Sequence, residues 1–310
     1  MKASDPIIYA IPAFVLLILV EMLWARKRAP RSFEPADTLT SLALGLGSTA
    51  LNFLSAGLVA AAALWLYQHR VFTIGWEWWA WIACFVLDDF NYYWAHRSGH
   101  RVRWFWASHV NHHSSQHYNL STALRQTWTG FIALSFTFRI WPVLLGFHPL
   151  MIAAVGGVNL IYQFWIHTEA IERCPRWFEA VMNTPSHHRV HHAVNPQYLD
   201  RNYAGVFIIW DRLFGTFQPE LDGTRIHYGI IKQLGSNNLL WSAFHEWIGI
   251  AKDLWRAPWR AKLGYVWRVP GWSHDGSRET SDMLRERWLE ASSGEVPQAE
   301  MDAPRGLEPR

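Results

Sequence analysis

Long apolar runs constrain the fold of this chain more than any other feature of the sequence. Residues 39–67 contain no charged side chain, and residues 7–24 form an earlier run of similar character. Three further runs follow, at residues 76–94, 128–147 and 149–166. Asp88 and Asp89 interrupt the first of these, and Arg139 and Pro142 break the second. About 20 apolar residues in a helix suffice to cross the hydrocarbon of a bilayer. We therefore expect an all-α, polytopic membrane protein with about four to five transmembrane helices.

The composition supports a membrane protein and disfavours several other classes. Charged residues make up 17% of the chain, against roughly 25% in soluble domains. The 21 tryptophans are typical of membrane interfaces, where an apolar ring meets water. A net charge of only +3 gives no electrostatic support for nucleic-acid binding. Cys84 and Cys174 are too few for a disulfide framework or a cysteine-type zinc site.

Sixteen histidines are unevenly distributed and form three boxes. The first box is HxxxH and the other two are HxxHH; their histidines are His96, His100, His109, His112, His113, His188, His191 and His192. Residues three or four apart share one face of a helix, so each box directs its imidazoles to one place. An HxxHH pattern arises by chance roughly 0.04 times in a chain of this length and histidine content. Imidazole suits Fe, Zn, Cu and Ni, so the boxes predict a metal site.

Eight ligands are too many for one ion, and we expect two ions. His167, at the end of the run 149–166, is a ninth expected ligand. His187 adjoins the third box but has the wrong spacing for its helical face. Residues 114–187 are long enough for a hairpin of two spans that returns the third box to the other two.

Three polar residues are expected to support the ligands, because ligating histidines usually donate their second N–H to a carboxylate or carbonyl. Asp89 lies two helical turns before His96, although a place at the water interface explains it equally well. Asp200 and Asn202 follow the third box and are expected to orient His191 or His192. We expect no catalytic side chain beyond the ligands.

The pattern over residues 89–100, with the two HxxHH boxes, resembles the fatty acid hydroxylase / sterol desaturase superfamily over roughly residues 76–219. The resemblance implies two Fe ions, O2 and a lipid substrate that enters from the bilayer and is hydroxylated or desaturated. It also implies electrons from tetrahydrobiopterin or an external electron-donor protein. The lipid could be a sterol, a fatty-acyl chain or an alkylglycerol ether. The ether-lipid branch resembles this chain most, at residues 114–126, 162–169, 183–192 and 202–217.

Two other functions remain open from the residues alone. A zinc-dependent hydrolase would need a general-base glutamate, and the sequence contains no HExxH pattern. A histidine-rich metal transporter would place ionisable residues in the middle of the membrane, whereas these boxes fall at the ends of runs. The boxes do not separate hydroxylation from desaturation.

The side of the membrane follows from charge. Arg26, Lys27, Arg28 and Arg31 follow the first run, and basic loops are usually cytoplasmic. With five spans, the segments after the first, third and fifth runs lie on that side, and these segments carry the boxes. We therefore expect an integral, multi-pass protein with a cytosolic, histidine-rich helical cap.

The runs and boxes divide the chain into four expected parts. Residues 1–75 are membrane anchor helices, and residues 76–219 are a di-iron catalytic domain. Residues 220–272 are expected to be an amphipathic helical extension. Residues 273–310 are rich in Glu, Ser, Pro and Arg and are expected to be disordered.

Overall fold

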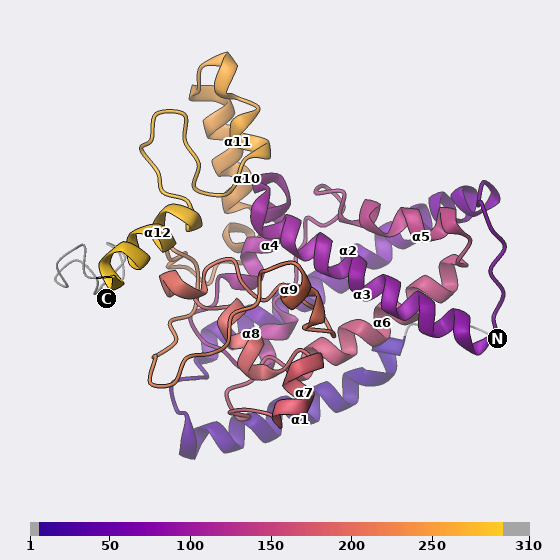
Figure 1. Cartoon of the computed structure of the whole chain (residues 1–310), viewed down its shortest axis with the longest axis horizontal. Helices are drawn as coiled ribbons and strands as arrows, with labels where there is room; N and C mark the ends of the chain where they lie inside the picture. The colour runs from indigo at the N-terminus through magenta and orange to yellow at the C-terminus, as the bar shows by residue number, and fades with distance from the viewer. Residues whose placement is uncertain (1–5, 294–310) are drawn as a thin grey trace.

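The computed structural model describes residues 6–293, and within them helices are the only regular elements (Figure 1). Two isolated bridges, Met182 with Phe207 and Ala193 with Tyr228, are the β-type pairings in this part of the chain. The expected all-α class is thereby confirmed for the described residues.

The first two helices have the length and composition of membrane spans. They are α1 (Pro6–Arg28) and α2 (Pro35–Gln68), and the apolar windows of both are almost wholly exposed on the protein surface. Glu34 caps α2 by accepting from the backbone N–H of Asp37. Exposed apolar surface on this scale is unfavourable in water, which points to association with a membrane. Among the described residues, α1 and α2 are the two helices that are both long enough and apolar enough to cross a membrane. The expected count of four to five spans therefore remains a prediction.

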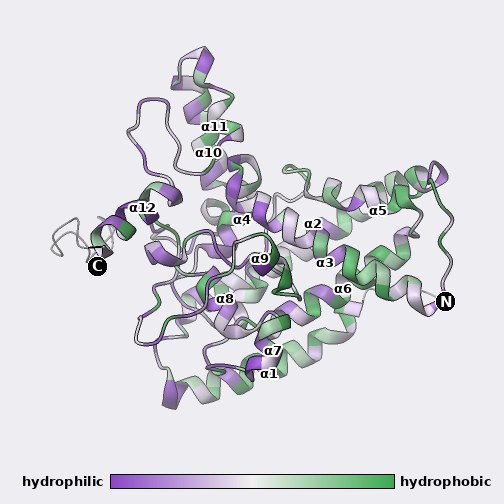
Figure 2. Cartoon of the chain, viewed as in Figure 1, coloured by the Kyte–Doolittle hydropathy of each residue, from purple (hydrophilic) through white to green (hydrophobic). Residues whose placement is uncertain are grey.

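Two further helices cross beside them. α3 (Trp78–Arg101) extends beyond the apolar run of residues 76–94 and carries the first histidine box at its C-terminal end. α6 (Pro149–Trp165) packs along α3. Their contact is partly polar, because the side-chain amide of Asn159 donates to Asp89 at 3.0 Å. Apolar residues dominate α5 and the N-terminal part of α3, and hydrophilic residues gather around α4, α8 and α12 (Figure 2).

The apolar run over residues 128–147 does not form one continuous helix. The segment contains a 3-10 turn, η2 (Ser135–Arg139), and a short helix, α5 (Ile140–Leu145). Gly146 ends α5 with φ of +119°, and a side chain there would collide with the backbone oxygen of Phe72. Pro142 lacks the N–H that a continuous helix needs.

Short helices carry the other two boxes. They are α4 (Arg103–His113), which begins after a break at Val102, and α8 (Pro185–His191). Four further short elements connect them to the rest: η1 (Leu120–Leu124), α7 (Arg176–Val181), η3 (Pro196–Tyr198) and α9 (Ile209–Leu213).

The C-terminal part consists of α10 (Leu239–Arg256), η4 (Trp259–Ala261), α11 (Gly264–Trp267) and α12 (Ser281–Ser292). α10 occupies the region expected to be amphipathic and is fixed to α4 by Arg103, which bonds Glu246 and Asp253 at 2.6 Å each.

The expectation of disorder from residue 273 is wrong for residues 281–292, which form α12. Thr280 caps this helix, and Asp282 within it bonds Arg101. The remainder of the expected tail, residues 294–310, lies outside the described residues.

Candidate metal centre

All nine predicted ligands converge on one region of the interior. α3 supplies His96 and His100, and α4 supplies the three histidines of the second box. His167 follows the end of α6, and the third box occupies the end of α8. Eight of these side chains are buried and His109 is partly buried. Helices from distant parts of the sequence thus bring the boxes together.

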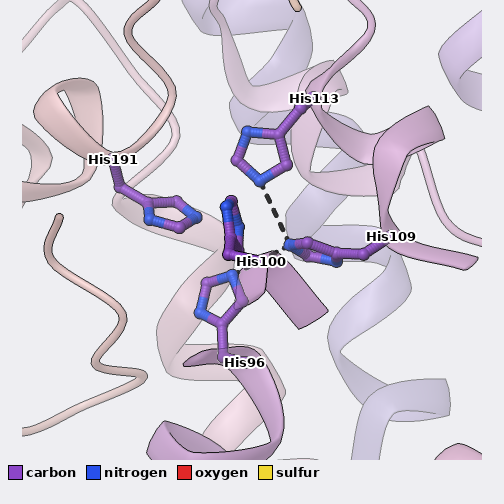
Figure 3. A group of neighbouring side chains, drawn as sticks. All are labelled: His96, His100, His109, His113 and His191. Carbon is purple, nitrogen blue, oxygen red and sulfur yellow. Dashed lines mark hydrogen bonds between the residues drawn. The ribbon is translucent and has the colours of Figure 1, made fainter. Parts of the chain in front are cut away.

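The first of two imidazole groups contains five histidines: His96, His100, His109, His113 and His191. One ring nitrogen from each lies within 4.8 Å of the others. His109 Nε2 is 2.9 Å from Nε2 of His96 and 3.1 Å from Nε2 of His113. Figure 3 shows the rings of this group pointing toward a common centre, with His96 and His113 on either side of His109.

The second group contains four histidines: His112, His167, His188 and His192. His188 Nε2 is 3.0 Å from Nε2 of His167 and 3.2 Å from Nε2 of His192. The two groups adjoin each other, because the rings of His113 and His192 stack with centroids 4.3 Å apart. The arrangement therefore offers two neighbouring sites rather than one.

Backbone carbonyls fix which nitrogen of each ring faces inward. His112 Nδ1 lies 3.3 Å from the oxygen of Arg125, and His167 Nδ1 lies 2.8 Å from the oxygen of Gln163. A carbonyl only accepts, so both Nδ1 atoms carry the proton and both Nε2 atoms present lone pairs. These two lone pairs face each other at 3.3 Å, where they cannot form a hydrogen bond. A cation between them removes the repulsion.

The spacing matches coordination geometry. Two nitrogens each about 2.1 Å from one ion and at right angles to each other are about 3.0 Å apart. The Nε2 to Nε2 distances of 2.9–3.3 Å agree with this value. In addition, Nε2 of His100 and Nε2 of His191 are buried without a hydrogen-bond partner among the described residues. The residues therefore fit metal ions.

Electrostatics also favour ligation. Burial, with the neighbouring imidazoles, lowers the pKa of His112, His113 and His192 well below the usual value. These rings are therefore neutral near pH 7, which is the form that binds metals.

The carboxylates expected to support the ligands occupy different places from those predicted. Asp200 Oδ1 lies 3.5 Å from His100 Nδ1, so it contacts the first box rather than His191 or His192. Asp200 also pairs with Arg101 at 3.1 Å. Burial opposes ionisation of Asp200, but His100 and Arg101 hold its pKa below the usual value.

Asp89 and Asn202 act on the backbone instead of on histidines. Asp89 accepts from the N–H groups of Val206 and Phe207 at 2.8 and 3.0 Å. The Asn202 amide donates to the oxygens of His187 and Gln218. Both residues therefore shape the loop after α8, and within residues 6–293 neither forms a hydrogen bond with a predicted ligand.

Sequence reasoning missed the groups that hold the rings directly, because they are main-chain atoms. The oxygen of Tyr203 bonds His96 Nδ1 at 2.8 Å, and the oxygen of Arg201 bonds His191 Nδ1 at 2.9 Å. Asp89 fixes the segment just after Tyr203, and Gly205 has no room for a side chain beside it. The sequence pointed to this segment only indirectly, because Asp200 and Asn202 are neighbours of Arg201 and Tyr203, whose carbonyl oxygens hold the rings.

Comparison with known proteins gives one matching family model and several relatives. Residues 81–216 match the model described as Fatty acid hydroxylase. Alkylglycerol monooxygenase of Homo sapiens is 38% identical, over 96% of this chain and 66% of that protein. The Xenopus tropicalis protein of the same name is 38% identical, over 84% of this chain and 58% of that protein.

A more distant relative is the cholesterol 25-hydroxylase-like protein of Danio rerio, 29% identical over 51% of this chain and 71% of that protein. The chain spans about two thirds or less of the length of the two alkylglycerol monooxygenases. No solved structure matches.

Proposed function

Residues 81–216 belong to the fatty acid hydroxylase family, and on this premise we propose that the chain is a membrane-bound, non-haem di-iron enzyme that uses O2 to oxidise a lipid. The observation that carries the proposal is the pair of adjoining imidazole groups, with five and four histidines. When bound, iron supplies O2 activation and an oxidant able to take hydrogen from an unactivated C–H bond. The chain supplies the nine imidazoles and a buried environment around them.

The number of imidazoles favours iron over zinc. Zinc in proteins is usually four-coordinate, and a catalytic zinc has three protein ligands and one open position. Five imidazoles in one group exceed that number, whereas a six-coordinate ion would keep one position free. Four imidazoles in the other group would leave two positions. O2 requires such open positions.

A membrane location with the histidines on the cytoplasmic side is supported by contacts at one end of the molecule. α1 ends in Arg26, Lys27 and Arg28. Directly after it, the oxygen of Arg31 bonds His117 Nδ1 at 2.8 Å, just beyond the second box. The histidine boxes therefore share an end of the molecule with the basic segment. By the positive-inside rule this end is cytoplasmic.

We propose the domain limits expected from the sequence, except that residues 281–292 form a helix. Residues 1–75 are proposed as the membrane anchor, with α3 and α6 completing the embedded part, and residues 76–219 as the catalytic unit. Residues 220–272 form the extension fixed to α4 through Arg103. Residues 281–292 are treated as an ordered helix rather than part of a tail.

Sequence identity to the relatives suggests the order in which lipid substrates are tested. The higher identity to alkylglycerol monooxygenase favours an alkylglycerol ether lipid, with a sterol second and a fatty-acyl lipid third. Hydroxylation would insert one oxygen atom of O2 into a C–H bond and release the other as water. Two electrons are needed, and we propose tetrahydrobiopterin or an external electron-donor protein as their source.

The test is metal analysis combined with an oxygen-isotope assay. The full-length protein, purified in detergent, should contain near two irons per chain. With a reductant and 18O2, it should place labelled oxygen in one of the three lipid classes. His113→Ala should abolish this activity, whereas His227→Ala, which removes an exposed side chain that belongs to neither group, should retain it. Zinc instead of iron, or a product formed without O2, would contradict the proposal.

A further inference from the structure

A cavity of about 490 Å3 lies outside both imidazole groups. α7, α9 and residues 217–220 border it, and its charged or titratable lining residues are Arg173, Arg176, Arg212, His187, Glu179 and Glu220. None of these residues belongs to the metal centre described above. The cavity therefore has a chemistry of its own.

The basic groups of this cavity keep hydrogen-bonding capacity. The side chain of Arg176 has no hydrogen bond or ion pair with any residue in the described part of the chain. Arg212 makes one hydrogen bond, to the backbone oxygen of Glu179 at 3.2 Å, and lies over the ring of Phe217.

The acidic groups, in contrast, already have partners within the protein. Glu220 pairs with Arg189 at 2.7 Å. Glu179 Oε1 accepts from the Ser186 hydroxyl at 2.8 Å and from the backbone N–H of Cys174 at 2.9 Å. Arg173 is the one lining arginine with an acidic partner, Asp222 at 2.6 Å. The capacity that remains belongs to donors, which suits an anion.

We propose that this cavity binds the phosphate of a membrane-lipid headgroup. The planar guanidinium groups of Arg176 and Arg212 can each present paired N–H donors to phosphate oxygens, the geometry that makes arginine the usual partner of phosphate.

Exposed apolar residues on the same two helices favour a lipid over a soluble phosphate. Trp177 on α7 is 74% exposed and Leu213 on α9 is 66% exposed. The bridge between Met182 and Phe207 joins the end of α7 to the segment before α9. Tryptophan prefers the membrane interface, and basic pockets at that level bind lipid headgroups. The inference depends on the proposed membrane location but not on the proposed chemistry.

The test uses the full-length protein in a neutral detergent and native mass spectrometry. The probes are dihexanoyl phosphatidic acid, dihexanoylglycerol, which lacks the phosphate, and inorganic phosphate. We expect phosphatidic acid to bind and the other two to bind at least about tenfold more weakly. Arg176→Gln and Arg212→Gln should each weaken binding by about tenfold, the size expected for loss of a charge-assisted hydrogen bond.

Two controls separate the possible causes of a negative result. Arg260→Gln changes an exposed arginine elsewhere on the surface and should bind phosphatidic acid as the unchanged protein does. Arg176→Lys keeps the charge, so its affinity for phosphatidic acid should fall less than that of Arg176→Gln. Equal binding of dihexanoylglycerol, or unchanged binding by both glutamine variants, would overturn the proposal. Tight binding of inorganic phosphate alone would also reject a lipid source. Iron content is measured in parallel, so that failure of the di-iron proposal is recognised separately.

Discussion

At the scale of single residues, carbonyl oxygens hold four of the nine histidines and determine the direction of their lone pairs. His167 shows this most clearly, because Gln163 on the last turn of α6 fixes its Nδ1 and leaves Nε2 facing His188 and His112. A ring held in this way needs little reorganisation when an ion binds. The same device recurs at His96 and His191.

Removing His167 should therefore affect one site more than the other. In His167→Ala, the second group keeps three imidazoles and the first group keeps five. We expect the iron content to fall from near two to near one per chain, because only the second site loses a ligand. Metal analysis of the purified variant, beside His227→Ala as the control, checks this. Loss of both irons, or of neither, would contradict the division into two groups.

A buried ion pair between Arg125 and Asp37 holds the backbone segment that contacts His112 of the second box. Arg125 is 1% exposed and bonds Asp37, in the first turn of α2, at 3.1 Å. Its backbone oxygen accepts from His112 Nδ1. Removing one partner of a buried pair leaves an uncompensated charge, which costs about 3–5 kcal/mol.

Arg125→Met should therefore lower the free energy of unfolding by about 3–5 kcal/mol. In the double variant Asp37→Leu with Arg125→Met, the free energy of unfolding should fall by clearly less than the sum of the losses in the two single variants, because no unpaired charge remains. Thermal or denaturant unfolding of the detergent-solubilised protein measures this. Additive losses would show that the pair does not act as a unit.

The sequence predicted the nine imidazoles but not their supports, and the physical reason is specific. Box spacing of three and four reports a helical face directly, so His96 and His100 needed only local geometry. Asp89, two turns before His96, was placed on that face but bonds the backbone of Val206 and Phe207. Main-chain acceptors such as the Tyr203 oxygen carry no side-chain signature, so a sequence pattern cannot reveal them.

At the scale of elements, α12 is linked to the metal centre by a chain of charges. Arg101 bonds Asp282 of α12 through two contacts and also bonds Asp200. Asp200 in turn lies against His100. The polar composition after residue 273 predicted disorder because this partner, Arg101, lies far away in the sequence. Another long-range contact occurs at Gly146, where the backbone of Phe72 leaves no room for a side chain.

Breaking the link at Asp282 should weaken the hold on His100. In Asp282→Ala, Arg101 keeps only Asp200 as an acidic partner. The side chains of Arg101 and Asp282 are 33% and 37% exposed, so we expect the free energy of unfolding to change by less than about 1 kcal/mol. Metal affinity of the first group should fall by about tenfold, the lower range for loss of an outer support. The measurement is iron retained against a chelator series.

The control for this change lies on the same helix. Glu286→Ala alters an exposed residue of α12 and should retain iron as the unchanged protein does. Unaltered chelator resistance in Asp282→Ala would mean that α12 is only a surface helix. Equal loss in both variants would point to a general loosening of α12 instead of the contact with Arg101.

At the scale of the whole molecule, polarity changes along the helices. α1, α2 and the first half of α3 present apolar residues, while hydrophilic residues gather around α4 and α8, which carry the second and third boxes (Figure 2). The metal centre would then lie at the border of the membrane, where a lipid can approach from the bilayer. The loop between α2 and α3, near Val71, lies at the opposite end of α2 from Glu34.

This arrangement predicts opposite accessibility for two engineered cysteines. In a Cys174→Ser background, Val71→Cys and Arg225→Cys both replace exposed residues, and Cys84 is buried. If the basic end is cytoplasmic, a membrane-impermeant maleimide should label Val71→Cys in intact cells and Arg225→Cys only after permeabilisation. The Cys174→Ser background alone is the control and should label in neither condition. Labelling of both positions from outside, or of neither, would reject a membrane crossing by α2, whereas exchanged accessibility would place the histidine boxes on the other side.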